Sequence, residues 1–265
     1  MTIPMRLRSL AAALTAAVLV STLTGQEDPK PAKEPDKEVA EKVAALKEIV
    51  ADKKFARDEE GKGVIDELHQ KLQAGVHPKD EAAIHKAFEG VLTQGKLRTP
   101  DNSGLYVAVA TALGYCGPQG AKILKTAYSG KRIPEHKDWV PLREQLLKNI
   151  GRTKDETMVK FLCDEARRNP EAALQASAGE ALGNFDESKE PVRKEIVSEL
   201  LIRYGELAEL ASQIGSSNIE AQNARDRLAT LSDKWNTTLG KMTRQNFTTF
   251  REWQTWFNNN KGKAW

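Results

Sequence analysis

The chain has 265 residues, of which 40% are hydrophobic and 29% are charged, so it can bury a core and is not a disordered tail. Its 40 basic and 37 acidic residues give a formal net charge of +3, and Lys is interleaved with Glu and Asp as on a solvated helix face. Because nucleic-acid binding needs clustered Lys and Arg, we expect no nucleic acid among its partners.

Residues 1–25 have the pattern of a secretory signal peptide. Arg6 and Arg8 give a basic start, the apolar run AAALTAAVLVSTL follows, and the sequence then turns abruptly polar. The run is shorter than the ~20 residues of a membrane span, and no Cys follows it as a lipid attachment site. We expect a periplasmic or secreted protein with no stable membrane span after cleavage, and an uncleaved anchor is the alternative.

Residues 26–36 carry three prolines among charged residues and are predicted to be a linker. Over residues 37–245 the sequence predicts one helix after another and no convincing strand. Two segments, LYVAVATALG and EAALQASAGEALG, are apolar nearly all round or rich in Ala, which suits inner helices covered on several sides. The clearest one-sided stripe, with Lys and Glu on its opposite face, consists of Val192, Ile196, Leu200, Tyr204 and Leu207.

Three glycines mark a repeat. Gly114, Gly151 and Gly183 each follow Leu or Ile, are spaced by 37 and 32 residues, and precede a polar turn and a second amphipathic helix. We interpret them as left-handed C-caps, where glycine is favoured. A period in the thirties built from two helices predicts an all-α solenoid, because one hairpin cannot bury its apolar face alone.

The repeated segments resemble HEAT-type repeats, including the short variety of phycobilin-lyase-like proteins. The resemblance is clearest over residues 103–211, extends more weakly over 38–95, and is interrupted by a longer loop, SGKRIPEHKDW, at 129–139. It implies a right-handed α-solenoid of stacked antiparallel helix pairs over residues 37–245, with about six pairs at the usual repeat length.

Residues 246–265 form the expected aromatic capping segment of this solenoid. Together with the preceding helix, they resemble the end of exported HEAT-repeat proteins of planctomycete-like bacteria, which carries a W-x-x-W segment. The resemblance brings no known activity with it. The matching positions are Leu239, Thr243, Asn246, Phe247, Trp253, Trp256 and Lys261.

The C-terminal aromatic residues allow two interpretations. In one, Phe250, Trp253 and Phe257 form one stripe of a short helix that folds back on helix 218–239 and seals its Trp235 as a structural cap. In the other, Trp256 and Trp265 stay exposed and bind a partner, since flat indoles suit sugar faces and protein hot spots.

We find no catalytic constellation in the sequence. The four histidines lack the spacing of a zinc site, and no phosphate loop or nucleophile elbow is present, so we expect no catalytic residue, metal or cofactor. Cys116 and Cys163 could pair in an oxidising compartment, or could be small apolar fillers of separate repeats.

The leading functional hypothesis is an exported, non-enzymatic HEAT-repeat scaffold that binds another protein through its solenoid surface. The second hypothesis is a module that binds a cell-envelope polysaccharide through the C-terminal tryptophans. The third is an enzyme of the HEAT-like lyase type, which would need Cys, His, Asp or Tyr side chains gathered on the concave face.

Overall fold

The computed structural model describes residues 34–213 and 219–265, all of them in helices, turns and loops without a strand. The expected signal peptide and residues 26–33 of the expected linker lie outside the described residues. The α-helices are α1 (Lys37–Ala51), α2 (Asp58–Ala74), α3 (Pro78–Thr93), α4 (Gly104–Leu113), α5 (Gly117–Ser129), α6 (Val140–Arg152), α7 (Val159–Arg168), α8 (Ala172–Leu182), α9 (Glu190–Ser212), α10 (Ile219–Thr243) and α11 (Phe250–Asn260). None of these helices has the length and the apolar character needed to cross a bilayer.

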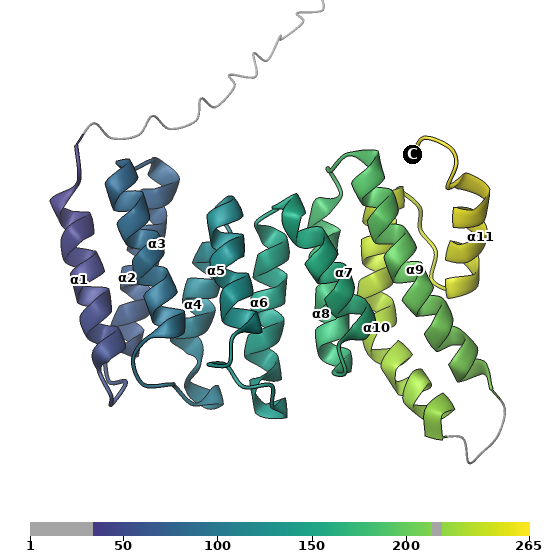
Figure 1. Ribbon diagram of the computed structural model, residues 1–265, viewed down its shortest axis with the longest axis horizontal. Coiled ribbons are helices and arrows are strands. Elements are labelled where there is room, and N and C mark those ends of the chain that lie inside the picture. The colour runs from purple at the N-terminus through teal and green to yellow at the C-terminus, as the bar shows by residue number, and fades with distance from the viewer. Residues whose placement is uncertain (1–33, 214–218) are drawn as a thin grey trace, which may run out of the picture.

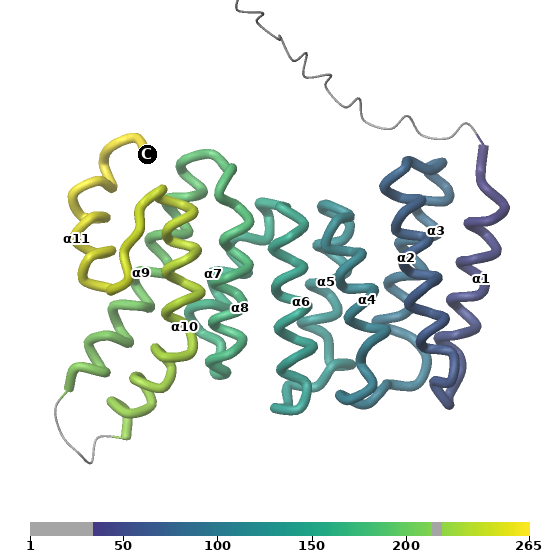
Figure 2. Tube along the Cα trace, turned by 180° about the vertical axis from the view of Figure 1, so that it is seen from behind, coloured from purple at the N-terminus to yellow at the C-terminus, as the bar shows by residue number. Residues whose placement is uncertain are grey.

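The helices pack in sequential pairs that line up side by side (Figure 1). Helices α1, α3, α5, α7 and α9 form one layer, and α2, α4, α6, α8 and α10 form the other (Figure 2). Most helices contact the next helix in the chain and the one after it, so contacts stay local along the stack. This sequential packing is consistent with a helical repeat arrangement.

Helix α4 shows why the two unusual segments are helices of the interior. It lies against α2, α3, α5 and α6, and it buries Leu105, Tyr106, Val109 and Leu113 completely or nearly so. The apolar residues of LYVAVATALG are therefore covered from several sides. Helix α8 is enclosed in the same way by α6, α7 and α10, which explains its small Ala-rich residues.

The predicted left-handed conformation of the glycine caps is wrong, although Gly114 and Gly183 are the C-caps of α4 and α8, as predicted. Gly114 and Gly183 have right-handed helical conformations, with φ of −58° and −61°, and Gly151 lies inside the last turn of α6. What these glycines share is close contact with the next helix of the even-numbered layer. An added Cβ would lie 2.8 Å from the Asn149 Oδ1 atom at Gly114, 2.3 Å from the Ala181 carbonyl oxygen at Gly151, and 3.0 Å from the Thr238 Oγ1 atom at Gly183.

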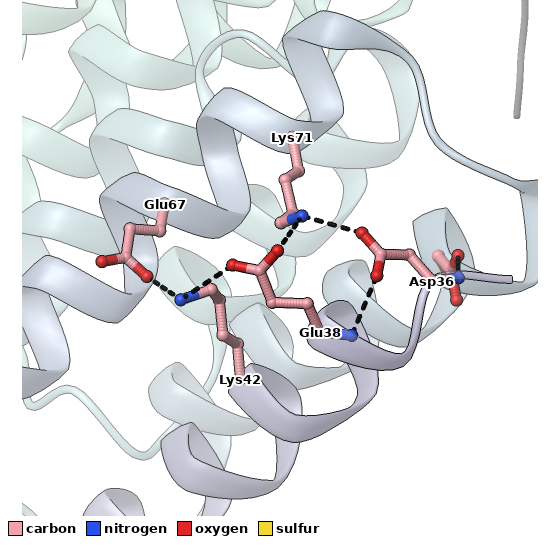
Figure 3. A network of polar contacts seen from close by, with 6 residues as sticks. Asp36, Glu38, Lys42, Glu67 and Lys71 are labelled. Carbon is pink, nitrogen blue, oxygen red and sulfur yellow. Dashed lines mark hydrogen bonds and ion pairs between the residues drawn. The ribbon is translucent and has the colours of Figure 1, made fainter.

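A polar network fastens the first helix to the second (Figure 3). Asp36 caps α1 by accepting from the Glu38 amide at 2.9 Å, and Lys71 of α2 donates to the carboxylates of Asp36 and Glu38 at 2.7 and 2.8 Å. Lys42 bridges Glu38 and Glu67. These hydrogen bonds from Lys71 lower the pKa of both Asp36 and Glu38. These charged side chains thus tie the start of α1 to α2.

Candidate functional site: the cleft between α5 and α7

The regular stacking is interrupted between α5 and α7. Within the described residues, the backbones of the other neighbouring helices of the odd-numbered layer approach each other more closely than those of α5 and α7, which meet through the side chains of Tyr128, Phe161 and Glu165. The loop 130–139 follows α5 here, and a cavity of about 610 Å³ opens between the two helices. We name this cavity the α5/α7 cleft. Its walls include Tyr128, Ser129, Glu135, His136, Lys137, Val140, Arg143, Asp164, Glu165, Arg168, Asn169, Pro170, Glu171 and Leu174.

A buried arginine lies at the base of the cleft. Arg143 of α6 is only 4% exposed, and its guanidinium stacks on the Tyr128 ring at 4.1 Å. Its Nη1 donates to the Tyr128 carbonyl oxygen at 3.1 Å, and its Nη2 lies 3.6 Å from the Glu135 carboxylate. The guanidinium therefore ties the end of α5 to α6 and to the loop while keeping its charge paired.

The opposite wall carries an oriented carboxylate. Glu165 of α7 accepts hydrogen bonds at its Oε2 from the Tyr128 hydroxyl and from the Asn169 side-chain amide, both at 2.6 Å. The amide of Asn169 also donates to the Tyr128 oxygen at 3.1 Å. Burial and the neighbouring Glu165 carboxylate raise the pKa of Tyr128, so the phenol keeps its proton and remains a donor. These two neutral donors orient the carboxylate of Glu165.

The loop side of the cleft holds groups with other chemistry. His136 Nδ1 lies 3.2 Å from the Asp138 carboxylate, and both side chains are exposed. Ser129 shares the cleft with His136, but no hydrogen bond joins them in the described structure. No group of three or more His, Cys, Asp or Glu side chains in the described ranges could hold a metal ion. Polar binding is the chemistry that this arrangement offers.

The structure buries two of the predicted cap residues completely. Trp235 lies against Gly179 and donates from Nε1 to the Gln175 carbonyl oxygen at 3.3 Å. Trp253 donates from Nε1 to the Asn236 side-chain oxygen at 2.9 Å. Phe257 is half-buried against the same core. Helix α11 is therefore joined to α10 through an indole hydrogen bond.

Helix α11 packs chiefly beside α9, whereas the sequence predicted that it would fold back on helix 218–239. Phe250 lies next to Gly205 and makes a tilted contact with Tyr204, with ring centroids 5.6 Å apart. Figure 1 shows α11 at the end of the stack beside α9. Because Gly205 has no side chain, the Phe250 ring fits against the backbone of α9.

Trp256 and Trp265 are less exposed than the second interpretation of the C-terminal aromatic residues requires. Both are half-buried, and their rings meet edge to face at 5.1 Å. Trp265 donates from Nε1 to the Asn260 carbonyl oxygen at 3.1 Å, and the charged groups of Arg193 and Lys194 lie 5.9 and 5.5 Å from its ring. The chain end is thus held against α9, which leaves less indole surface for a partner.

Cys116 and Cys163 are free thiols, so the possible disulfide is not formed in this structure. Cys116 lies in the turn between α4 and α5 and donates to the Ala112 carbonyl oxygen at 3.3 Å, whereas Cys163 is buried in α7. Burial raises the pKa of Cys116 to about 11 and that of Cys163 to about 12. Both sulfurs are therefore protonated at neutral pH, in separate helix pairs.

The sequence did not identify the α5/α7 cleft as a site, although it contained one signal for it. The insertion SGKRIPEHKDW supplies four residues of the cleft wall, but in the sequence it shows only as an irregularity of the repeat. Tyr128, Arg143 and Glu165 come from three helices, and no motif links them in the chain.

A scan against protein-family models gave no match, and searches of the curated proteins and of the solved structures gave none either. The function is therefore argued from the geometry of the chain itself.

Proposed function

We propose that this protein is an exported, non-enzymatic scaffold of right-handed HEAT-type repeats that binds another protein. The α5/α7 cleft is the observation that carries the proposal. Evenly stacked helices offer ridges and shallow grooves, whereas the cleft provides a recess of about 610 Å³ within such a surface. Interface hot spots are typically side chains that fill pockets of this kind, so a partner loop docks here with one anchoring residue.

The other two candidate functions have less support. Glycan binding through Trp256 and Trp265 needs open indole faces, but these two indoles contact each other, and that of Trp265 also lies beside two cations of α9. A lyase-type reaction at Cys116 or Cys163 needs a thiolate, and burial disfavours the thiolate at both.

Photo-crosslinking tests the scaffold proposal at a single position. A photoreactive residue at Arg168, whose side chain is 74% exposed in the wall of the cleft, should give a discrete protein adduct in the periplasmic or secreted fraction of the native cell. The matched control is Lys160, which is 83% exposed on the same helix but lies outside the cleft wall. An adduct at neither position, or the same adducts at both, would contradict the proposal.

A further inference from the structure

We infer that the α5/α7 cleft takes a basic side chain of the partner, a lysine ammonium or an arginine guanidinium, against the carboxylate of Glu165. This inference rests on the proposed function and names the chemistry of the anchoring residue. It follows from the charge balance of the cleft, from the geometry of Glu165, and from the shape of the walls.

Two of the four carboxylates in the cleft wall, Glu165 and Glu171, form no ion pair with a described residue, and of the two only Glu165 is oriented by side-chain hydrogen bonds. Asp164 already pairs with Lys160 at 3.3 Å and with Arg168 at 3.8 Å, and Glu135 lies 3.6 Å from Arg143. Among the described residues, no Lys, Arg or His forms an ion pair with Glu165. Glu165 is half-buried and is held by hydrogen bonds alone, so its carboxylate group is already in place for an incoming cation.

The geometry of Glu165 leaves room for that cation. Its Oε2 atom receives the hydrogen bonds of Tyr128 and Asn169, and no hydrogen bond from a described residue reaches its Oε1 atom. Because the two donors already fix the plane of the carboxylate, little conformational entropy of the Glu165 side chain is lost when a guest binds. Charge-assisted hydrogen bonds of this type are shorter and stronger than neutral ones.

The walls of the cleft suit the stem of a long basic side chain. Val140 and Leu174 contribute apolar surface beside the charged groups, and Pro170 adds a further apolar edge. Lys and Arg side chains bury their methylene stems along such surface while the charged end reaches a partner. An acidic guest would meet Lys137 and Arg168 instead, and the experiment below separates the two cases.

The test is an NMR titration of the full chain with four blocked amino acids. The probes are the N-acetyl methylamides of lysine, arginine, citrulline and glutamate. We expect the two basic probes to bind about tenfold more tightly than citrulline, which has the shape of arginine without its charge. Glu165→Gln should abolish this roughly tenfold preference for the basic probes. The substitution keeps an acceptor for the Tyr128 hydroxyl but removes the negative charge. The control is Glu187→Gln, which removes a paired carboxylate outside the cleft and should change the affinity less than threefold.

Three results would overturn the inference: equal binding of citrulline and arginine, tighter binding of the glutamate probe, or an unchanged affinity in Glu165→Gln. An unaltered melting temperature of Glu165→Gln shows that a lost affinity is not a lost fold. If a discrete adduct forms at Arg168 but the protein binds all four probes equally, the cleft does not select a basic side chain, and the scaffold proposal stands. If the protein prefers the basic probes but no adduct forms, the cation site stands, and the scaffold proposal is wrong.

Discussion

At the scale of single residues, a fully buried arginine outside the cleft should contribute strongly to stability. Arg98, in the loop between α3 and α4, is 0% exposed and donates to both oxygens of Asp58 at 2.7 and 2.6 Å. Its backbone amide donates to the Tyr106 hydroxyl at 3.1 Å, and its guanidinium lies 4.9 Å from the Phe55 ring centroid. This side chain joins the turn after α1 to the loop before α4.

Replacing this arginine should be strongly destabilising. In Arg98→Met the Asp58 carboxylate stays buried without its partner, and breaking such a pair typically costs about 3–5 kcal/mol of unfolding free energy. Urea denaturation followed by circular dichroism measures the change. The loss should be smaller in the double variant Asp58→Asn/Arg98→Met, because that variant leaves no buried charge unpaired.

Arg57→Met provides the matched control, because Arg57 makes a bidentate contact with Glu60 on the surface. Exposed ion pairs contribute little to stability, so this variant should unfold nearly like the wild type. Equal losses for Arg57→Met and Arg98→Met would show that burial of the Arg98 pair does not matter for stability.

At the scale of helices, the glycines set how closely the even-numbered layer packs. Gly151→Ala should destabilise the protein by about 1–3 kcal/mol, the usual cost of overpacking, or by more. The reason is that the new Cβ would lie 2.3 Å from the Ala181 carbonyl oxygen, so α6 and α8 must move apart. Thermal unfolding and urea denaturation both report this loss.

A second glycine provides the control, because its substitution by Ala should change the unfolding free energy in the opposite direction. Gly63 lies within α2, and an added Cβ there would meet no atom within 4 Å. Gly63→Ala should therefore stabilise the helix by about 0.5–1 kcal/mol, through the lost freedom of the unfolded chain. If both substitutions stabilised the protein, the close contact of α6 with α8 would not limit its packing.

These same elements show which parts of the structure the sequence could predict. One-sided apolar stripes predicted the helices because spacing along the chain reports which face is buried. The repeat glycines were located but assigned the wrong conformation, because a C-cap is a local feature whereas the contact of Gly151 with Ala181 depends on another helix. The cleft could not be predicted, since it depends on how far α5 and α7 stand apart.

At the scale of the whole molecule, stability should be distributed along the stack. Helices contact their near neighbours in the chain, so each interface stabilises mainly the pairs that share it. The N-terminal pair is fastened by the network around Lys71, and α11 covers the other end through Phe250 and Trp253 (Figures 1 and 3). The two ends thus differ: a polar network joins the first two helices at one end, and an additional helix packs on α9 at the other.

Removing residues 246–265 should therefore weaken one end of the protein and spare the other. The deletion uncovers the face of α9 around Tyr204 and Gly205, so amide hydrogen exchange in α9 and α10 should accelerate while protection in α1–α4 stays at the full-length level.

Trp253→Ala should reproduce the pattern, because truncating a buried tryptophan typically costs about 3–5 kcal/mol. Half-buried Trp256 provides the control, and Trp256→Ala should have a smaller effect. Equal acceleration in all helices would mean that the stack unfolds as one unit, and no acceleration in α9 would mean that α11 does not cap it.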